Sequence, residues 1–202
     1  MDVTMKFLYT AAISLLLLLP GCTTASDRIT ETARTRALTS ELTVIAADNV
    51  EEESSLCLGC FSTEFNAKNK RRTNNIVLAS DKINQTVIEP GATFSYNETV
   101  GPTSKKNGFK LSTIFIRGEK YEGYGGGVCQ VSSTLYNAAA NAGMKIIERH
   151  DHSMPVDYVV KGKDAATSYG GIDFKFQNTK MFPVVIESHV EDGKITIALN
   201  AV

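Results

Sequence analysis

The sequence has little net charge and few histidines. Its 202 residues carry a formal charge of −1, so nothing in the composition favours bulk attraction to nucleic acid, and we expect no nucleic-acid partner. The one basic run, residues 68–72, predicts a solvated loop, with contact to an anionic envelope polymer as the alternative. Only three histidines are present, His150, His152 and His189, so any imidazole base must come from among them.

The N-terminus has no apolar run long enough for a typical membrane-spanning helix. Lys6 gives a basic start, and the apolar residues 7–19 fall short of the ~18 residues that a spanning helix needs, but fit a signal-peptide core. The run ends in the motif LPGC, which resembles a lipobox. We therefore expect residues 1–21 to be a lipoprotein-type signal peptide and Cys22 to carry the lipid that anchors the protein in the membrane. An ordinary cleaved signal and a retained anchor are the alternatives, and all three place the domain outside the cytoplasm.

The rest of the chain divides into a tether and one folded domain. Residues 22–55 are rich in Thr, Ser and Ala and poor in aromatic side chains, which is typical of a flexible tether. Residues 56–202 are near the usual size of one domain and suffice for one hydrophobic core. They contain no internal repeat and no low-complexity tract.

The folded part has the pattern of an α+β domain. Apolar spacing predicts a central helix over residues 129–142, closed by Gly143, and a shorter helix over residues 74–84. The remaining pattern predicts a mostly antiparallel sheet packed on the central helix. Its strands are expected within residues 86–96, divided by a Pro-Gly turn, and at residues 111–121, 144–148, 172–176, 183–189 and 194–199, the last two joined by a turn at Asp192-Gly193.

Cys129 follows three consecutive glycines at the start of the predicted central helix. At 100° per residue it points away from the apolar stripe of that helix, which comprises Val128, Val131, Leu135, Ala138 and Ala142. The first turn has free backbone N–H groups and the positive end of the helix dipole, both of which favour a thiolate. Gly125, Gly126 and Gly127 leave the sulfur open to an approaching chain.

Two histidines follow the helix within one short segment. An antiparallel strand after the helix returns the chain towards the helix start, so His150 and His152 are expected to lie beside Cys129. With a thiol nucleophile, an imidazole base and N–H groups for an oxyanion, aided by Gln130, the segment has the groups needed for acyl transfer. The carboxylate that orients the base is open among four candidates: Asp151, Asp157, Asp164 and Asp173.

Simpler interpretations remain for the same residues. A free cysteine is often a small core residue, and glycines before a helix can reflect close packing alone. A zinc site built from Cys129, His150 and His152 lacks an evident fourth ligand, so we expect neither a metal nor a cofactor. Cys57 and Cys60 form a CxxC motif in a segment that looks extended, where residues i and i+3 face opposite ways, so a structural or incidental role is favoured over a redox role.

Four segments of the chain look familiar: GGGVCQVSSTLYNAA, ERHDHSMPVDYV, residues 162–176 and the upstream FSTEFN. Together they resemble the VanW-like family, whose namesake is an accessory protein of vancomycin B-type resistance clusters. The resemblance implies a protein of the bacterial cell envelope, and it supplies no reaction. It carries over the Gly-Gly-Gly-x-Cys-Gln motif at residues 125–130 and an Arg-His-x-His-Ser motif that contains Arg149, His150, His152 and Ser153.

The combined hypothesis is a lipid-anchored domain that acts on or near peptidoglycan. Cys129 is the expected nucleophile, His150 or His152 the base, and Asp173 or Asp151 the orienting carboxylate, with Gln130 at the oxyanion. The expected substrate is a peptide stem or cross-link, bound by Gly125, Gly126, Gly127, Arg149 and Ser153. The alternative is a module that binds cell-wall peptide without turnover, because N–H groups at a helix start also hold carboxylates.

Overall fold

The computed structural model describes residues 56–116 and 118–202. The expected signal peptide, the lipidation site Cys22 and the tether over residues 22–55 lie outside the described residues. Within the described part, no helix combines the length and the apolar character needed to cross a membrane.

A four-stranded antiparallel sheet forms one side of the core. Its order is β1 (Cys57–Glu64), β9 (Lys194–Ala201), β8 (Val184–Glu191) and β2 (Thr86–Ile88). The predicted turn between the last two strands is confirmed, since Asp192 and Gly193 take positive φ angles of 49° and 80°. This sheet brings the two ends of the described domain together as neighbouring strands.

The expectation of a single sheet is too simple. A second sheet has the order β3 (Thr93–Ser95), β7 (Lys175–Gln177), β6 (Lys145–Glu148), and a third is the hairpin of β4 (Leu111–Ile116) and β5 (Glu119–Tyr124). The two strands predicted within residues 86–96 exist but do not pair with each other, because β2 pairs with β8 and β3 with β7. The α+β class, with antiparallel pairing, is nevertheless confirmed.

The two predicted helices are present. The central one is α4 (Val128–Asn141), and the shorter one is α2 (Lys70–Ile83), which begins earlier than expected because the Asn69 side chain caps it by accepting the Arg72 backbone N–H at 3.2 Å. The prediction of a loop over residues 68–72 is therefore wrong from Lys70 onwards. The sequence pattern did not indicate the short helix α3 (Tyr96–Val100) or a 3-10 turn at Lys105–Asn107.

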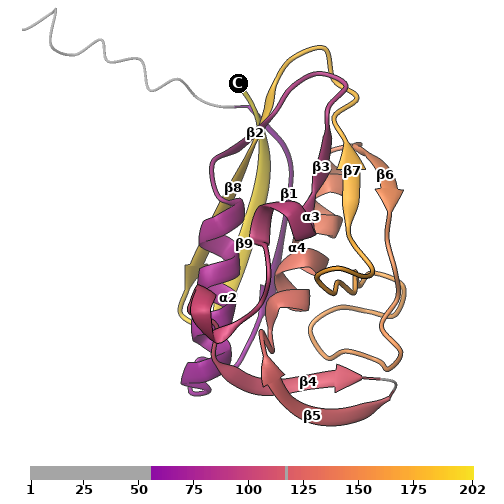
Figure 1. The fold of residues 1–202 in the computed structure, drawn as a ribbon. Helices are drawn as coiled ribbons and strands as arrows, with labels where there is room; N and C mark the ends of the chain where they lie inside the picture. Colours follow the sequence, from indigo (N-terminus) through magenta and orange to yellow (C-terminus); the bar gives the residue numbers. More distant parts are fainter. Residues whose placement is uncertain (1–55, 117) are drawn as a thin grey trace, which may run out of the picture. The chain divides into compact units, whose positions relative to one another are not determined.

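Helix α4 fills the centre of the domain. It packs against β1 and β9 of the four-stranded sheet and against β6 of the three-stranded sheet, and Figure 1 shows it between them. The predicted apolar stripe is confirmed, since Val131, Leu135 and Ala138 are fully buried. The first turn of α4 lies at the β4–β5 end of the domain, because Tyr124, the last residue of β5, is only four residues before Val128.

The Cys57–Cys60 motif differs from its expected geometry. The register between β1 and β9 shifts between Cys57 and Gly59, so the regular alternation of an extended strand is interrupted inside the motif. Burial and the neighbouring Cys60 thiol raise the pKa of Cys57. Both cysteines are free and exposed.

The contact between β1 and α4 leaves no room for a side chain at Gly59. A Cβ atom there would lie 2.3 Å from the backbone nitrogen of Ala142. We expect Gly59→Ala to lower the free energy of unfolding by about 3 kcal/mol, measured by urea denaturation, because strand and helix must separate. The control Gly171→Ala meets only contacts of 3.4 Å or longer and should change stability by about 0.5 kcal/mol or less. Equal stability of the two variants would contradict this packing.

Candidate active site

A pocket of about 820 Å³ opens at the start of α4. Its walls come from the segment that joins β1 to α2, from α2 and α3, from the β4–β5 hairpin and the glycine turn, and from two stretches of the long segment between β6 and β7. The side chains that matter chemically are those of Arg72, Cys129, His152, Asp157, Tyr158 and Thr167.

Cys129 lies in the first turn of α4 and lines this pocket. The helix starts after Gly127, which takes a left-handed φ of 108°, and the Tyr96 hydroxyl donates a hydrogen bond to the Val128 carbonyl at 2.9 Å. The cysteine is half-buried, off the apolar stripe as expected. Among the described residues, no hydrogen-bond acceptor is found for its backbone N–H, in keeping with its place in the first turn.

The polar face of α4 binds the segment that carries the other site residues. The Ser133 hydroxyl accepts the Ala165 N–H at 2.9 Å, and the Ser132 hydroxyl donates to the Ala165 carbonyl at 2.6 Å. These bonds bring Thr167 next to the thiol, with Cys129 Sγ 3.4 Å from its carbonyl oxygen and 3.8 Å from its hydroxyl oxygen. The residues one turn beyond Cys129 therefore position the pocket wall.

His152 is the imidazole that the fold brings to Cys129. Its Nδ1 lies 2.6 Å from Asp164 Oδ2, and the same oxygen accepts the His152 backbone N–H at 2.7 Å. A carboxylate only accepts hydrogen bonds, so Nδ1 carries the proton and Nε2 is left for the thiol. The side chains of His152 and Asp164 are 12% and 8% exposed, so the pair is shielded from competing water.

The charges of this cluster support one another. Burial raises the pKa of the Cys129 thiol. The hydrogen bond and charge of His152, together with hydrogen bonds from Thr167, lower this pKa by more than burial raises it, so the net pKa is below that of an ordinary cysteine. For His152 the directions are reversed. Burial lowers the pKa of its imidazole, and the interactions with Cys129 and Asp164 raise it by more, so the net pKa is above its usual value. The arrangement therefore favours a thiolate beside an imidazolium, the reactive form of a cysteine.

The three predicted glycines line the pocket, and each is also required by close packing. A Cβ atom on Gly125 would lie 2.7 Å from Thr103 Cβ, one on Gly126 would lie 2.4 Å from the Thr113 carbonyl oxygen, and one on Gly127 would lie 3.0 Å from Arg72 Cγ. Close packing and an open approach to the pocket both require the absence of side chains in this turn.

Gln130 does not present its amide to the pocket as an oxyanion donor. Its Nε2 donates to the Thr63 hydroxyl and the Glu64 carbonyl, each at 2.9 Å, and its Oε1 accepts from Arg72 at 2.8 Å. Since its side chain is also buried, Gln130 is a positioning residue for Arg72.

The carboxylate that orients the His152 imidazole is Asp164. It is one of the four candidate aspartates, but it is neither Asp173 nor Asp151, the two that the sequence analysis favoured. Asp173 accepts hydrogen bonds from the Ser95 hydroxyl at 2.6 Å and the Asn97 N–H at 2.9 Å, at the start of α3, and Asp151 is exposed and paired with Arg149. Several aspartates fall in one irregular segment, and only its path decides which one meets the imidazole.

His150, Arg149 and Ser153 do not line the pocket. His150 bonds Glu148 at 3.1 Å, and Arg149 donates to the Asp164 carbonyl at 2.6 Å while stacking over the Tyr136 ring, so it supports Asp164 rather than a ligand. Ser153 is exposed.

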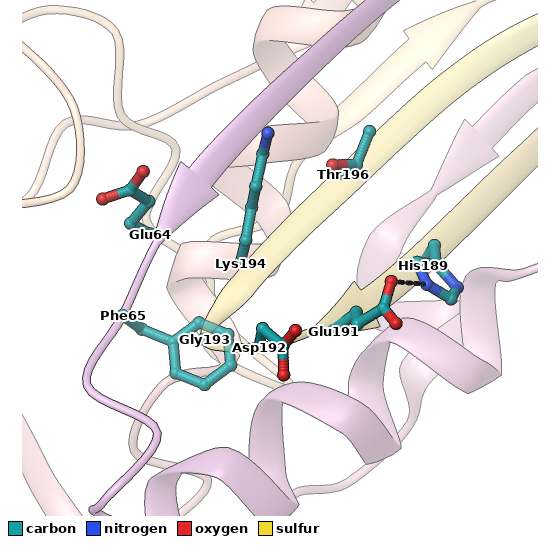
Figure 2. A pocket seen from close by; sticks show the side chains of 8 residues that line it. All are labelled: Glu64, Phe65, His189, Glu191, Asp192, Gly193, Lys194 and Thr196. Atoms are coloured by element: carbon teal, nitrogen blue, oxygen red, sulfur yellow. Dashed lines mark hydrogen bonds and ion pairs between the residues drawn. The ribbon is translucent and has the colours of Figure 1, made fainter.

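His189 lies elsewhere, in a shallow pocket of about 550 Å³ at the β8–β9 hairpin. It bonds Glu191 at 3.2 Å, and Figure 2 shows the pair beside Asp192 and Gly193, with no cysteine among the lining residues. In the described part of the chain, no group of three or more His, Cys, Asp or Glu side chains is arranged to hold a metal ion.

Sequence reasoning missed Arg72, Tyr158 and Thr167. Arg72 precedes the fully buried Ile76 by one helical turn, so a helix starting at Asn69 would have placed it on the inner face. The Tyr158 hydroxyl lies 3.5 Å from His152 Nε2, and burial and the charge of Cys129 raise its pKa well above the usual value. No sequence signal singles out Tyr158 or Thr167.

Residues 71–200 match the family described as VanW like protein. The chain belongs to this family. It is 44% identical over 142 residues to a protein of Bacillus subtilis (strain 168) described as Uncharacterized protein YoaR, which covers 70% of the chain and 47% of that relative. It is 32% identical over 126 residues to the Vancomycin B-type resistance protein VanW of Enterococcus faecalis (strain ATCC 700802 / V583), covering 60% of the chain and 46% of that relative. The VanW-like domain thus spans about half the length of each relative, and no solved structure matches the chain.

The dependence of the thiol on Asp164 can be tested by pH titration. We expect the alkylation of Cys129 by iodoacetamide to have a pH midpoint below that of an ordinary cysteine. Asp164→Asn removes the charge that raises the pKa of His152, so the imidazolium is lost at lower pH and the midpoint for Cys129 moves upwards. Mass spectrometry separates the Cys129 peptide from those of Cys57 and Cys60. The exposed Asp81→Asn serves as a control and should leave the midpoint unchanged; an unshifted midpoint in Asp164→Asn would refute the role of Asp164.

Proposed function

We propose that this VanW-like domain is a cysteine-dependent acyl-transfer enzyme. The observation that carries the proposal is the Cys129–His152–Asp164 cluster, in which a thiol of lowered pKa and an imidazole held by a buried carboxylate line one pocket. These are the groups of a thiol nucleophile, its base and the residue that orients the base.

The reaction follows from the positions of these groups. Cys129 Sγ attacks the carbonyl carbon of an amide, and the oxyanion forms near the first-turn N–H groups of α4. His152 gives a proton from Nε2 to the leaving nitrogen, the C–N bond breaks, and an amine and a thioester result. Water or a second amine then attacks the thioester, His152 accepts its proton, and the thiolate leaves. The outcome is hydrolysis with water and transpeptidation with an amine.

The proposed substrate class follows from the location that we propose for the protein, the cell envelope. The expected lipoprotein signal over residues 1–21 and lipidation of Cys22 would hold the domain at the outer face of the membrane. The enterococcal relative carries a name that refers to vancomycin B-type resistance. Both points support peptidoglycan peptide stems as the acyl substrate.

Loss of the thiol separates catalysis from binding. We expect Cys129→Ser to lower the turnover of a purified muropeptide mixture by at least about 1000-fold, because the hydroxyl does not ionise near neutral pH. The measurement is release of new amines, followed by chromatography and mass spectrometry, with Cys60→Ser as the matched control that should retain activity. If Cys129→Ser binds muropeptides and the wild-type protein binds them equally without turnover, the domain is a binding module.

A further inference from the structure

We infer that Arg72 recognises a free carboxylate on the ligand of the Cys129 pocket, so that the preferred substrate is a peptide with a carboxylate close to its reacting carbonyl. The inference deepens the proposed function, on which it rests for the identity of the reacting group. It concerns a residue of α2 that lies 57 positions before the nucleophile in the chain.

Arg72 is held against the turn that carries Cys129. A Cβ atom on Gly127 would lie 3.0 Å from Arg72 Cγ, so the absence of a side chain at Gly127 makes room for the Arg72 side chain. One guanidinium nitrogen donates to Gln130 Oε1 at 2.8 Å, and Gln130 is in turn fixed by bonds to Thr63 and Glu64. The guanidinium therefore has a set orientation beside the first turn of α4.

The charge of Arg72 has no carboxylate partner in the described part of the chain. The other two described arginines are both paired, Arg71 with Glu122 at 3.7 Å and Arg149 with Asp151 and Asp164. Arg72 is half-buried, and burial lowers its pKa, an effect that the charges of Tyr158, Asp157 and Cys129 only partly offset. A partly desolvated cation without a carboxylate in direct contact is costly, and a ligand anion would lower that cost.

The guanidinium group suits a carboxylate better than it suits other groups that a peptide offers. Within residues 56–116 and 118–202, the guanidinium donates one hydrogen bond, to Gln130, which leaves donors for a two-point contact with a carboxylate. Because Arg72 and Cys129 line the same pocket, one peptide can engage both. A carboxylate fixed by Arg72 would align the neighbouring carbonyl with Cys129 Sγ.

Two alkylating agents test this directly, because both react with Cys129 Sγ and only one carries a carboxylate. The rate constants for alkylation by iodoacetate and by iodoacetamide are measured on the Cys129 peptide at one pH. The rate constant for iodoacetate is then divided by that for iodoacetamide. The ratio cancels any change in thiolate fraction that a mutation causes. We expect Arg72→Gln to lower it by about tenfold, since hydrogen bonds between ionised partners are strong.

Matched variants separate charge from fold. Arg71→Gln removes an exposed arginine from the same turn of α2 and should leave the ratio at the wild-type value. Arg72→Lys keeps the positive charge and should retain part of the preference for iodoacetate. If thermal melting shows that Arg72→Gln is unfolded, Arg72→Lys becomes the variant that tests the inference. An equal ratio in wild type, Arg72→Gln and Arg72→Lys would overturn the inference even if Cys129 is highly reactive. A Cys129 that reacts no faster than a free thiol with iodoacetamide would instead count against the proposed enzyme, because that reagent does not depend on Arg72.

Discussion

The polar face of α4 is the feature on which the site depends. Ser132 and Ser133 bind both backbone groups of Ala165, and Asn137 donates to the Lys163 carbonyl at 2.6 Å. All three side chains are buried, so leaving them without these partners would be costly. They fix the irregular segment between β6 and β7 on the helix, and so fix Asp164, which this segment carries, relative to Cys129.

Burial and pairing oppose each other throughout the cluster. Burial alone would neutralise the thiol, the imidazole and the carboxylate, because each ionised form loses water. Each of them instead has a partner of opposite charge, so their pKa values move towards ionisation. Arg72 lies at the edge of this balance, since it is half-buried and the hydrogen-bond acceptor that the described residues offer its guanidinium, Gln130, is neutral. The pocket therefore combines an internally balanced thiol site with a cation that a ligand can neutralise.

Regular elements were predictable because their signals are local. The 3.6-residue period of α4, the Asp192-Gly193 turn and the alternation along β8 and β9 each depend on a few neighbouring residues. The start of α2 was predicted too late because the basic run over residues 68–72 was interpreted as a loop, although Asn69 within it caps the helix. The partition into three sheets was missed because the pairing of β2 with β8, and of β3 with β7, joins segments about 80 to 100 residues apart.

The sequence alone determined the α+β class, the central helix and the position of Cys129 away from its apolar stripe, since helical geometry fixes which residues share a face. It also limited the base to three histidines. Only the tertiary structure decided that His152 and Asp164 meet the thiol, that Asp173 and His150 do not, and that Arg72 enters the pocket from another helix. The physical reason is that an irregular segment has no period, so the path between β6 and β7 is set by hydrogen bonds to distant side chains.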